Sequence, residues 1–207
     1  MRAIIFDVDN TLIDWKDEFV FALKSVIEDM SYSFDEELIK KIDIMIDNYD
    51  KKSITLSKES LLNYVNTNCD INLSIDFMNR LIFAQGNCVY EDKELIETIT
   101  YLSKKYDLYV ITNWFTETQV KRLENMGIAK YFKKIIGADI NYLKPDIRSF
   151  DIILNDYKPE ECISVGDTFK NDVELPLNLG MNAIWKTNKL SNEYKTIKTI
   201  YELKKIL

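Results

Sequence analysis

The stretch "AIIFDVDNTLID", residues 3–14, places Asp7 and Asp9 at the end of the first apolar run of the chain. Residues 3–8 are rich in β-branched and aromatic side chains, which predicts a short strand buried in an α/β core. Burying an unpaired carboxylate costs several kcal/mol, so packing alone does not favour an acid here. The stretch therefore predicts that positive charge compensates the two aspartates.

A helical segment follows, from Asp14 to about Asn87. Its apolar residues recur at helical spacing, in one stripe of Phe19, Leu23, Val26, Ile27 and Met30 and another of Leu38, Ile42, Met45 and Tyr49. Ser57 and Ser74 stand where the N-caps of two further helices are expected. Because no strand pattern interrupts this stretch, we expect an inserted helical bundle at residues 15–88.

Strands and helices alternate from Asp92 onward. Strands are predicted at 107–112, 134–138, 162–167 and 182–186, and helices at 92–105, 116–126, 146–157, 170–179 and 199–207. This alternation predicts an α/β fold with a doubly wound parallel sheet, formed by residues 1–14 and 89–207. Such sheets bind ligands at the carboxyl ends of their strands.

The composition excludes several kinds of chemistry. None of the 207 residues is histidine, so a Ser-His-Asp triad, a histidine-bound zinc and a histidine general base are all excluded. The three cysteines form no CxxC pair or disulfide framework. With 27 basic and 34 acidic residues the net charge is −7, which disfavours a nucleic acid polymer as partner. No apolar run is long enough for a membrane span and no signal peptide is evident, so we expect no membrane partner and a cytoplasmic location.

Polar residues stand at the carboxyl end of each predicted central strand. They are Asp7, Asp9 and Thr11 after the first strand, Thr112 and Asn113 after "DLYVIT", Lys144 in "LKPD", Asp167 after "CISVG", and Asn171 and Asp172 in the turn that follows. Each group alone is weak, because such dipeptides usually mark turns. Together they predict one acidic site with a lysine at one edge of the sheet.

In this order, the segments "DVDNT", "ITN", "LKPD" and "GDTFKND" resemble the four motifs of the haloacid dehalogenase superfamily. The inserted helices resemble the type-one cap of that family, which selects the substrate, and the nearest branch is that of nucleotidases and sugar-phosphate phosphatases. Asn10 stands where the family commonly has glycine, but asparagine tolerates positive φ. Pro176 also departs from the pattern and should kink the last core helix or shift its start.

The resemblance implies a role for each motif residue. Asp7 would be the nucleophile and a metal ligand, and Asp9 would transfer protons and bind the metal through its backbone carbonyl. Thr112 and Asn113 would bind the phosphoryl group, and Lys144 would bind it and neutralise its charge. Mg²⁺ is the expected cofactor, with Asp7, Asp9, Asp167 and Asp172 as its predicted ligand set.

We therefore expect a Mg²⁺-dependent phosphomonoester hydrolase that forms an aspartyl-phosphate on a small soluble phosphorylated metabolite. Nucleoside 5′-monophosphates are the first candidates, because Trp15 or Trp114 could stack on a base, and sugar phosphates come next. The alternative for each indole is simple packing between cap and core. Alternative functions are a phosphomutase, a hydrolytic dehalogenase and a non-catalytic binding module.

Overall fold

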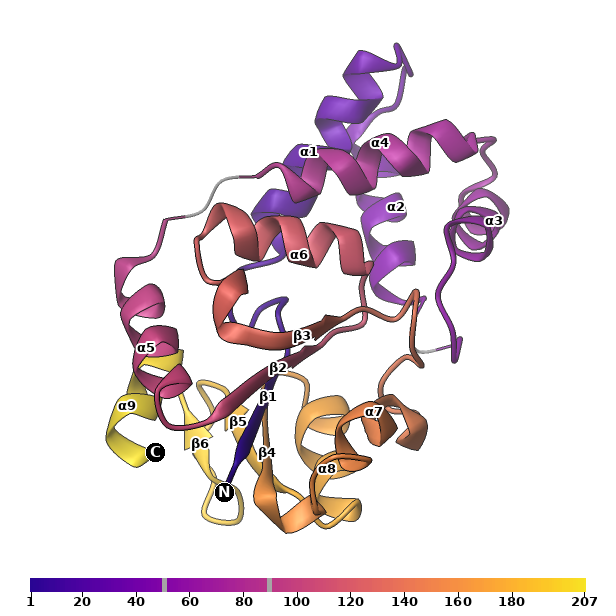
Figure 1. The fold of residues 1–207 in the computed structure, drawn as a ribbon. Helices are drawn as coiled ribbons and strands as arrows, with labels where there is room; N and C mark the ends of the chain where they lie inside the picture. Colours follow the sequence, from indigo (N-terminus) through magenta and orange to yellow (C-terminus); the bar gives the residue numbers. More distant parts are fainter. Residues whose placement is uncertain (50–51, 89–90) are drawn as a thin grey trace.

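The computed structural model describes residues 1–49, 52–88 and 91–207 (Figure 1). Its described residues form a six-stranded sheet in which every pairing is parallel, in the order β3-β2-β1-β4-β5-β6. The strands are β1 (Ala3–Phe6), β2 (Asp107–Ile111), β3 (Phe132–Ile136), β4 (Cys162–Gly166), β5 (Asn182–Lys186) and β6 (Thr196–Ile197). The predicted doubly wound parallel sheet is confirmed.

The alternation of side chains along β1 supplies both faces of the sheet with apolar residues. Ile4 and Phe6 belong to a buried cluster with α5 (Lys93–Ser103), α6 (Thr116–Asn125) and α9 (Leu203–Ile206). Ala3 and Ile5 belong to a second cluster, with α7 (Asp151–Leu154) and α8 (Leu175–Asn178). Because β1 is buried on both faces and paired on both edges, its carboxyl end lies at the middle of the sheet.

Four further helices lie beyond the carboxyl ends of the strands (Figure 1). They are α1 (Lys16–Asp29), α2 (Glu36–Asp47), α3 (Lys58–Cys69) and α4 (Ile75–Gly86). The predicted caps are confirmed, since Ser57 accepts a hydrogen bond from the backbone N–H of Ser60 and Ser74 from that of Phe77. These helices share one apolar cluster. The predicted boundary at 88/89 borders residues 89 and 90, which lie outside the described residues, so the division into core and cap stays a prediction.

Helix α6 and the loop after β3 attach these four helices to the sheet. The Thr118 hydroxyl of α6 donates to the Ile82 carbonyl of α4 over 3.2 Å. The Leu143 N–H donates to the Ile54 carbonyl, between α2 and α3, over 3.0 Å. The side chain of Trp114, which follows β2, also belongs to the apolar cluster of the four helices. The space above the strand ends is therefore enclosed on two sides.

Several predicted elements differ in form. The helix predicted at 146–157 is a 3₁₀ turn, Ile147–Phe150, followed by α7. The helix predicted at 199–207 is likewise a 3₁₀ turn, Ile200–Glu202, followed by α9. The helix predicted at 170–179 is a π-helix, Phe169–Glu174, that continues directly into α8. Pro176 is the second residue of α8, so the change from π-helix to α-helix falls next to the residue that has no N–H to donate.

Three strands also differ from their predictions by two residues. The strand predicted at 3–8 ends at Phe6. The strand predicted at 134–138 begins at Phe132 and ends at Ile136, and β6 was not predicted. With only two residues, β6 is too short to show a period, so its pairing with β5 had no signal in the sequence. Among the described residues, no helix combines the length and the apolar character that crossing a membrane requires.

Candidate active site

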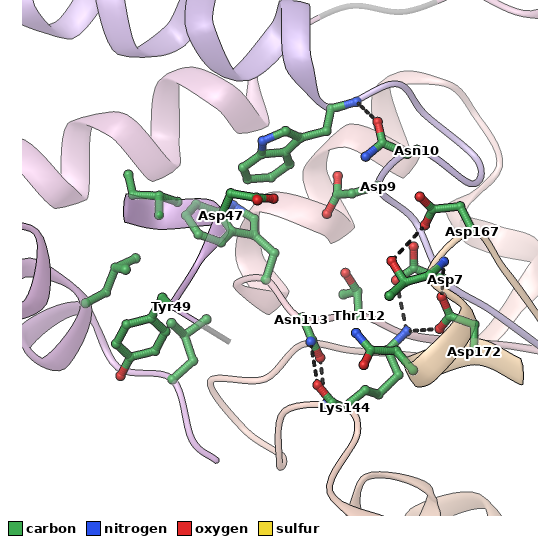
Figure 2. A pocket seen from close by; sticks show the side chains of 17 residues that line it. Asp7, Asp9, Asn10, Asp47, Tyr49, Thr112, Asn113, Lys144, Asp167 and Asp172 are labelled. Atoms are coloured by element: carbon green, nitrogen blue, oxygen red, sulfur yellow. Dashed lines mark hydrogen bonds and ion pairs between the residues drawn. The ribbon is translucent and has the colours of Figure 1, made fainter. Parts of the chain in front are cut away.

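The order of the strands brings the predicted site residues together. Asp7 follows β1, Thr112 follows β2, Lys144 lies in the loop after β3, and Asp167 follows β4. All four line one pocket of about 130 Å³, together with Asp9, Asn10, Asn113, Asn171 and Asp172. Figure 2 shows Asp7, Lys144, Asp167 and Asp172 on one wall of this pocket, and Asp47, the last residue of α2, and Tyr49 on the other.

Lys144 supplies the positive charge that compensates the Asp7 carboxylate at the end of the first strand. Its Nζ donates to Asp7 Oδ1 over 3.0 Å and to Asp172 Oδ1 over 2.6 Å, and the residue is 2% exposed. Burial alone would lower the pKa of Lys144, but the carboxylates of Asp172 and Asp7 outweigh burial and raise it. The ammonium is therefore charged across the physiological pH range.

The backbone of Lys144 is held by Asn113. The Asn113 amide donates to the Lys144 carbonyl over 2.8 Å, and its oxygen accepts from the Lys144 N–H over 2.8 Å. These paired bonds fix the end of β2 to the loop after β3, and so fix the start of the lysine side chain. The side chain of Asn113 therefore has a structural task at the pocket wall, and its contact with substrate stays a prediction.

Asp7, Asp167 and Asp172 form the one cluster of potential metal ligands detected among the described residues, with one oxygen of each within 4.8 Å of the others. Asp172 Oδ2 also accepts from the Thr168 N–H over 3.1 Å. Gly166 makes this close approach possible, because a Cβ at 166 would lie 2.2 Å from Asp172 Cγ. Hard carboxylate oxygens at this spacing fit Mg²⁺, which prefers oxygen ligands.

The electrostatics of this cluster also fit a cation. Burial, followed by the charges of Asp7 and Asp172, raises the pKa of Asp167 to about 7. Burial likewise raises the pKa of Asp172 to about 6, although Lys144 opposes the rise. The positive charge of Lys144 is thus too small to keep Asp167 and Asp172 at their ordinary pKa values. A bound dication would favour the ionised form of both carboxylates.

These shifts predict how the stability of the metal-free protein depends on pH. A carboxyl group with a raised pKa in the folded state contributes stability that is complete below its ordinary pKa of 3.8 and is lost as the pH rises through the folded value, here about 6 and 7. We therefore expect the free energy of unfolding in chelator to increase by on the order of 2 kcal/mol between about pH 8 and about pH 5. Chemical denaturation across this range measures it.

Saturating Mg²⁺ is the control for this prediction. The ion favours the ionised carboxylates, so the gain in stability toward low pH should shrink when it is present. A metal-free protein whose stability is constant or falls between about pH 8 and about pH 5 would contradict the charge distribution described above.

The Asp9 carboxylate lies apart from the three-acid cluster. Its Oδ1 accepts from Arg122 Nη1 over 2.5 Å, and its Oδ2 accepts from Gln119 Nε2 over 2.6 Å. Burial raises the pKa of Asp9, and Arg122 opposes this rise. The Gln119 amide also donates to Thr112 Oγ1 over 3.1 Å, so one α6 side chain contacts two predicted site residues. The part of Asp9 in metal binding, through its carbonyl, stays a prediction.

The site residues that the sequence analysis missed include Gln119 and Arg122 on α6 and the pocket-lining Asp47 on α2. Arg122 is 1% exposed and Gln119 is fully buried, on the same helix as the apolar Leu123. Their spacing of three places both on one face of α6, beside Leu123 and Met126. Polar residues on an otherwise apolar helical stripe were the available signal, because they must find partners when buried.

The two indoles of the pocket pack against each other. The rings of Trp15 and Trp114 meet edge to face, with 4.9 Å between centroids, and Trp15 stacks on Phe19 at 4.6 Å. Trp114 is only 5% exposed and also meets Phe19 and Phe115 edge to face. These contacts favour the packing alternative for Trp114, whose ring edges and faces are largely covered by other aromatic rings.

Comparisons with known proteins agree with this geometry. The model of the family described as "Haloacid dehalogenase-like hydrolase" matches residues 4–186. A glyceraldehyde 3-phosphate phosphatase of Methanothermobacter thermautotrophicus is 27% identical over 212 residues, which span 92% of this chain and 88% of the relative. Human N-acylneuraminate-9-phosphatase is 27% identical over 215 residues, spanning 91% and 83%. Among solved structures, the HAD-hydrolase YfnB of Bacillus subtilis, bound to magnesium, matches with a TM-score of 0.81 at 20% identity, covering 100% of this chain and 98% of that one.

Proposed function

The chain belongs to the haloacid dehalogenase-like hydrolase family, and from this premise we propose that it is a Mg²⁺-dependent phosphatase of small phosphomonoesters. The predicted family and the prediction of a phosphatase agree with relatives that are named as phosphatases. The observation that carries the proposal is the ion pairing of the buried Lys144 with Asp7 and Asp172 beside Asp167. This arrangement combines a carboxylate nucleophile with the positive charge that an anionic substrate requires.

In the proposed reaction the Asp7 carboxylate attacks phosphorus, and the bond between phosphorus and the ester oxygen breaks. Asp9 gives a proton to the departing oxygen, which leaves as an alcohol. Water then attacks the phosphorus of the aspartyl-phosphate and gives its proton to Asp9, and the bond to Asp7 breaks to release phosphate. Lys144 lies 3.0 Å from Asp7, where it would neutralise charge that develops on the phosphoryl oxygens.

Asp7, Asp167 and Asp172 would hold the Mg²⁺ in this proposal. When bound, the ion supplies charge neutralisation between the nucleophile and the anionic substrate. Thr112 lines the pocket next to Asp9 and Asn113, where its hydroxyl could bind a phosphoryl oxygen while accepting from Gln119. The dehalogenase alternative does not explain Asp9, since a departing halide needs no proton.

Phosphate release is expected to require Mg²⁺, to be supported in part by Mn²⁺, and to be inhibited by Ca²⁺. Ca²⁺ takes more oxygen ligands at longer distances, which disturbs the in-line geometry of attack. The measurement is phosphate release from a panel of phosphorylated metabolites in each ion and in chelator. Full activity in excess chelator would remove the metal from the proposal, and transfer of phosphate within the substrate, without release, would instead identify a phosphomutase.

The size and charge of the pocket favour a small substrate without a second negative group. A pocket of about 130 Å³ is smaller than the roughly 300–1,000 Å³ of sites for drug-sized ligands. Six of the described pocket residues come from the segment between Trp15 and Leu61, and Asp47 is the charged residue among them. We therefore propose a phosphorylated polyol or sugar of about triose size, and nucleoside 5′-monophosphates remain the second candidate because both indoles line the pocket.

Asp47→Asn is expected to raise kcat/KM for 3-phosphoglycerate relative to glyceraldehyde 3-phosphate by about 5–10-fold. The two substrates are similar in size, but the first carries a carboxylate that the Asp47 side chain would repel. The ratio of kcat/KM values for the two substrates in each variant measures the effect. Asp43→Asn is the matched control, since Asp43 lies one turn earlier on α2 and is not among the described pocket residues. An unchanged ratio in Asp47→Asn would remove this residue from substrate selection.

A further inference from the structure

A chain of buried polar contacts joins a cap helix to the predicted proton-transfer residue. Glu18 of α1 accepts from Arg122 Nε over 2.9 Å and lies 2.7 Å from Arg122 Nη2. On its other side, Arg122 donates through Nη1 to Asp9 over 2.5 Å. The guanidinium thus bridges two carboxylates that come from different parts of the molecule.

Gln119 completes the enclosure of the Asp9 carboxylate. Its Nε2 donates to Asp9 Oδ2 over 2.6 Å, while its Oε1 accepts from Arg122 Nη1 over 2.8 Å. Each oxygen of Asp9 therefore has its own donor, and the two donors are bonded to each other. Two donors fixed in this way leave the carboxylate one orientation, because rotation of the Asp9 side chain would break both bonds.

Packing alone does not explain an arginine at this place. Burying a guanidinium is costly, and apolar residues of similar volume in place of a buried ion pair are often neutral or stabilising. The same face of α6 carries Leu123, which is fully buried in the apolar core. A buried ion pair is therefore weak evidence for stability, and the contact of Arg122 with Asp9 favours a task at the site.

We propose that Arg122 and Gln119 are positioning residues that orient the Asp9 carboxylate toward the pocket, and that Glu18 holds the guanidinium in place. This inference rests on the proposed function, because it assigns a support to the residue that would protonate the leaving oxygen. The support acts on the step in which the leaving group departs. Its loss should therefore matter most for substrates whose leaving oxygen must receive a proton.

The test compares Arg122→Met and Arg122→Lys on two substrates, glycerol phosphate and p-nitrophenyl phosphate. The alkoxide of glycerol needs a proton to leave, whereas nitrophenolate leaves without one. The quantity is kcat/KM, which reports only steps up to the first irreversible one and so excludes hydrolysis of the aspartyl-phosphate. We expect Arg122→Met to lower kcat/KM about 10–100-fold more for glycerol phosphate than for p-nitrophenyl phosphate. Arg122→Lys, which keeps the charge, should recover part of this difference.

Two further variants calibrate the result. Asp9→Asn should show the same selective loss, only larger, because it removes the proton donor itself. Arg80→Met is the matched control, since Arg80 also bridges two carboxylates, Asp29 and Asp76, but on the exposed surface of the cap. Arg80→Met should leave both kcat/KM values unchanged.

Equal losses on both substrates in Arg122→Met, or no loss on either, would overturn the inference and leave Arg122 a structural residue. If Arg122→Met does not unfold cooperatively, Arg122→Lys and Glu18→Gln decide the question by the same ratio, with a selective loss supporting the inference and an equal loss overturning it. A wild-type protein that releases phosphate from neither substrate would instead remove the proposed function. The two failures are therefore distinguishable.

Discussion

Asp7→Asn is expected to lower phosphate release by about 10⁴–10⁶-fold, as loss of a covalent nucleophile does in other hydrolases. The amide is nearly isosteric with the carboxylate but cannot attack phosphorus. The fold should be retained, because Lys144 keeps its second partner, Asp172, at 2.6 Å. Single-turnover measurements with trapping of the phosphorylated enzyme in acid should find no covalent phosphate in the variant.

Asp29→Asn is the control for this experiment. Asp29 of α1 also pairs with a basic side chain, that of Arg80 of α4, but both side chains are exposed, so Asp29→Asn should leave turnover unchanged. Residual turnover near wild type in Asp7→Asn, with a normal unfolding transition, would remove Asp7 from the nucleophile role.

Lys144→Met is expected to have the second largest effect, on activity and on stability together. Methionine keeps much of the length of the side chain but removes the charge that Asp7 and Asp172 share. The free energy of unfolding in chelator should fall by about 3–5 kcal/mol, because buried carboxylates lose their partner. Loss of the charge facing the phosphoryl group should lower kcat by about 10²–10³-fold.

Mg²⁺ should restore part of the stability of Lys144→Met but not its activity, since the ion would compensate the carboxylates without replacing the ammonium. Denaturant titration in chelator and in Mg²⁺ measures the first effect, and phosphate release measures the second. Lys24→Met, which removes an exposed ion pair with Glu36, is the control and should change neither. Equal stability of wild type and Lys144→Met in chelator would contradict the central place of this lysine.

The positions of Asp7, Thr112, Lys144 and Asp167 were predictable because each follows a strand whose apolar run is visible in the sequence. In a parallel sheet, the carboxyl ends of neighbouring strands share one edge, so the sequence order alone predicts that the four residues meet.

The partners of Asp9 could not be predicted in the same way. Gln119 and Arg122 lie within α6, where glutamine and arginine at helical spacing usually mark a solvated face. Their burial depends on the helices between residues 15 and 88 that cover α6, and hence on packing between segments distant in the sequence. Helices α7 and α9 are shorter than predicted, because each is preceded by a 3₁₀ turn, Ile147–Phe150 or Ile200–Glu202. The spacing of apolar residues does not distinguish a 3₁₀ turn from the first turn of an α-helix.

Gly166 and Asp172 are coupled in a way that restricts how this protein can evolve. Any side chain at 166 would collide with the carboxyl group of Asp172, and shortening the residue at 172 to relieve the collision would take away a partner of Lys144. Neither position can therefore change first without loss. In a saturation library, position 166 should accept glycine only, and no second substitution at 172 should restore the activity of a variant at 166. No combination of substitutions at these two positions should therefore give an active protein.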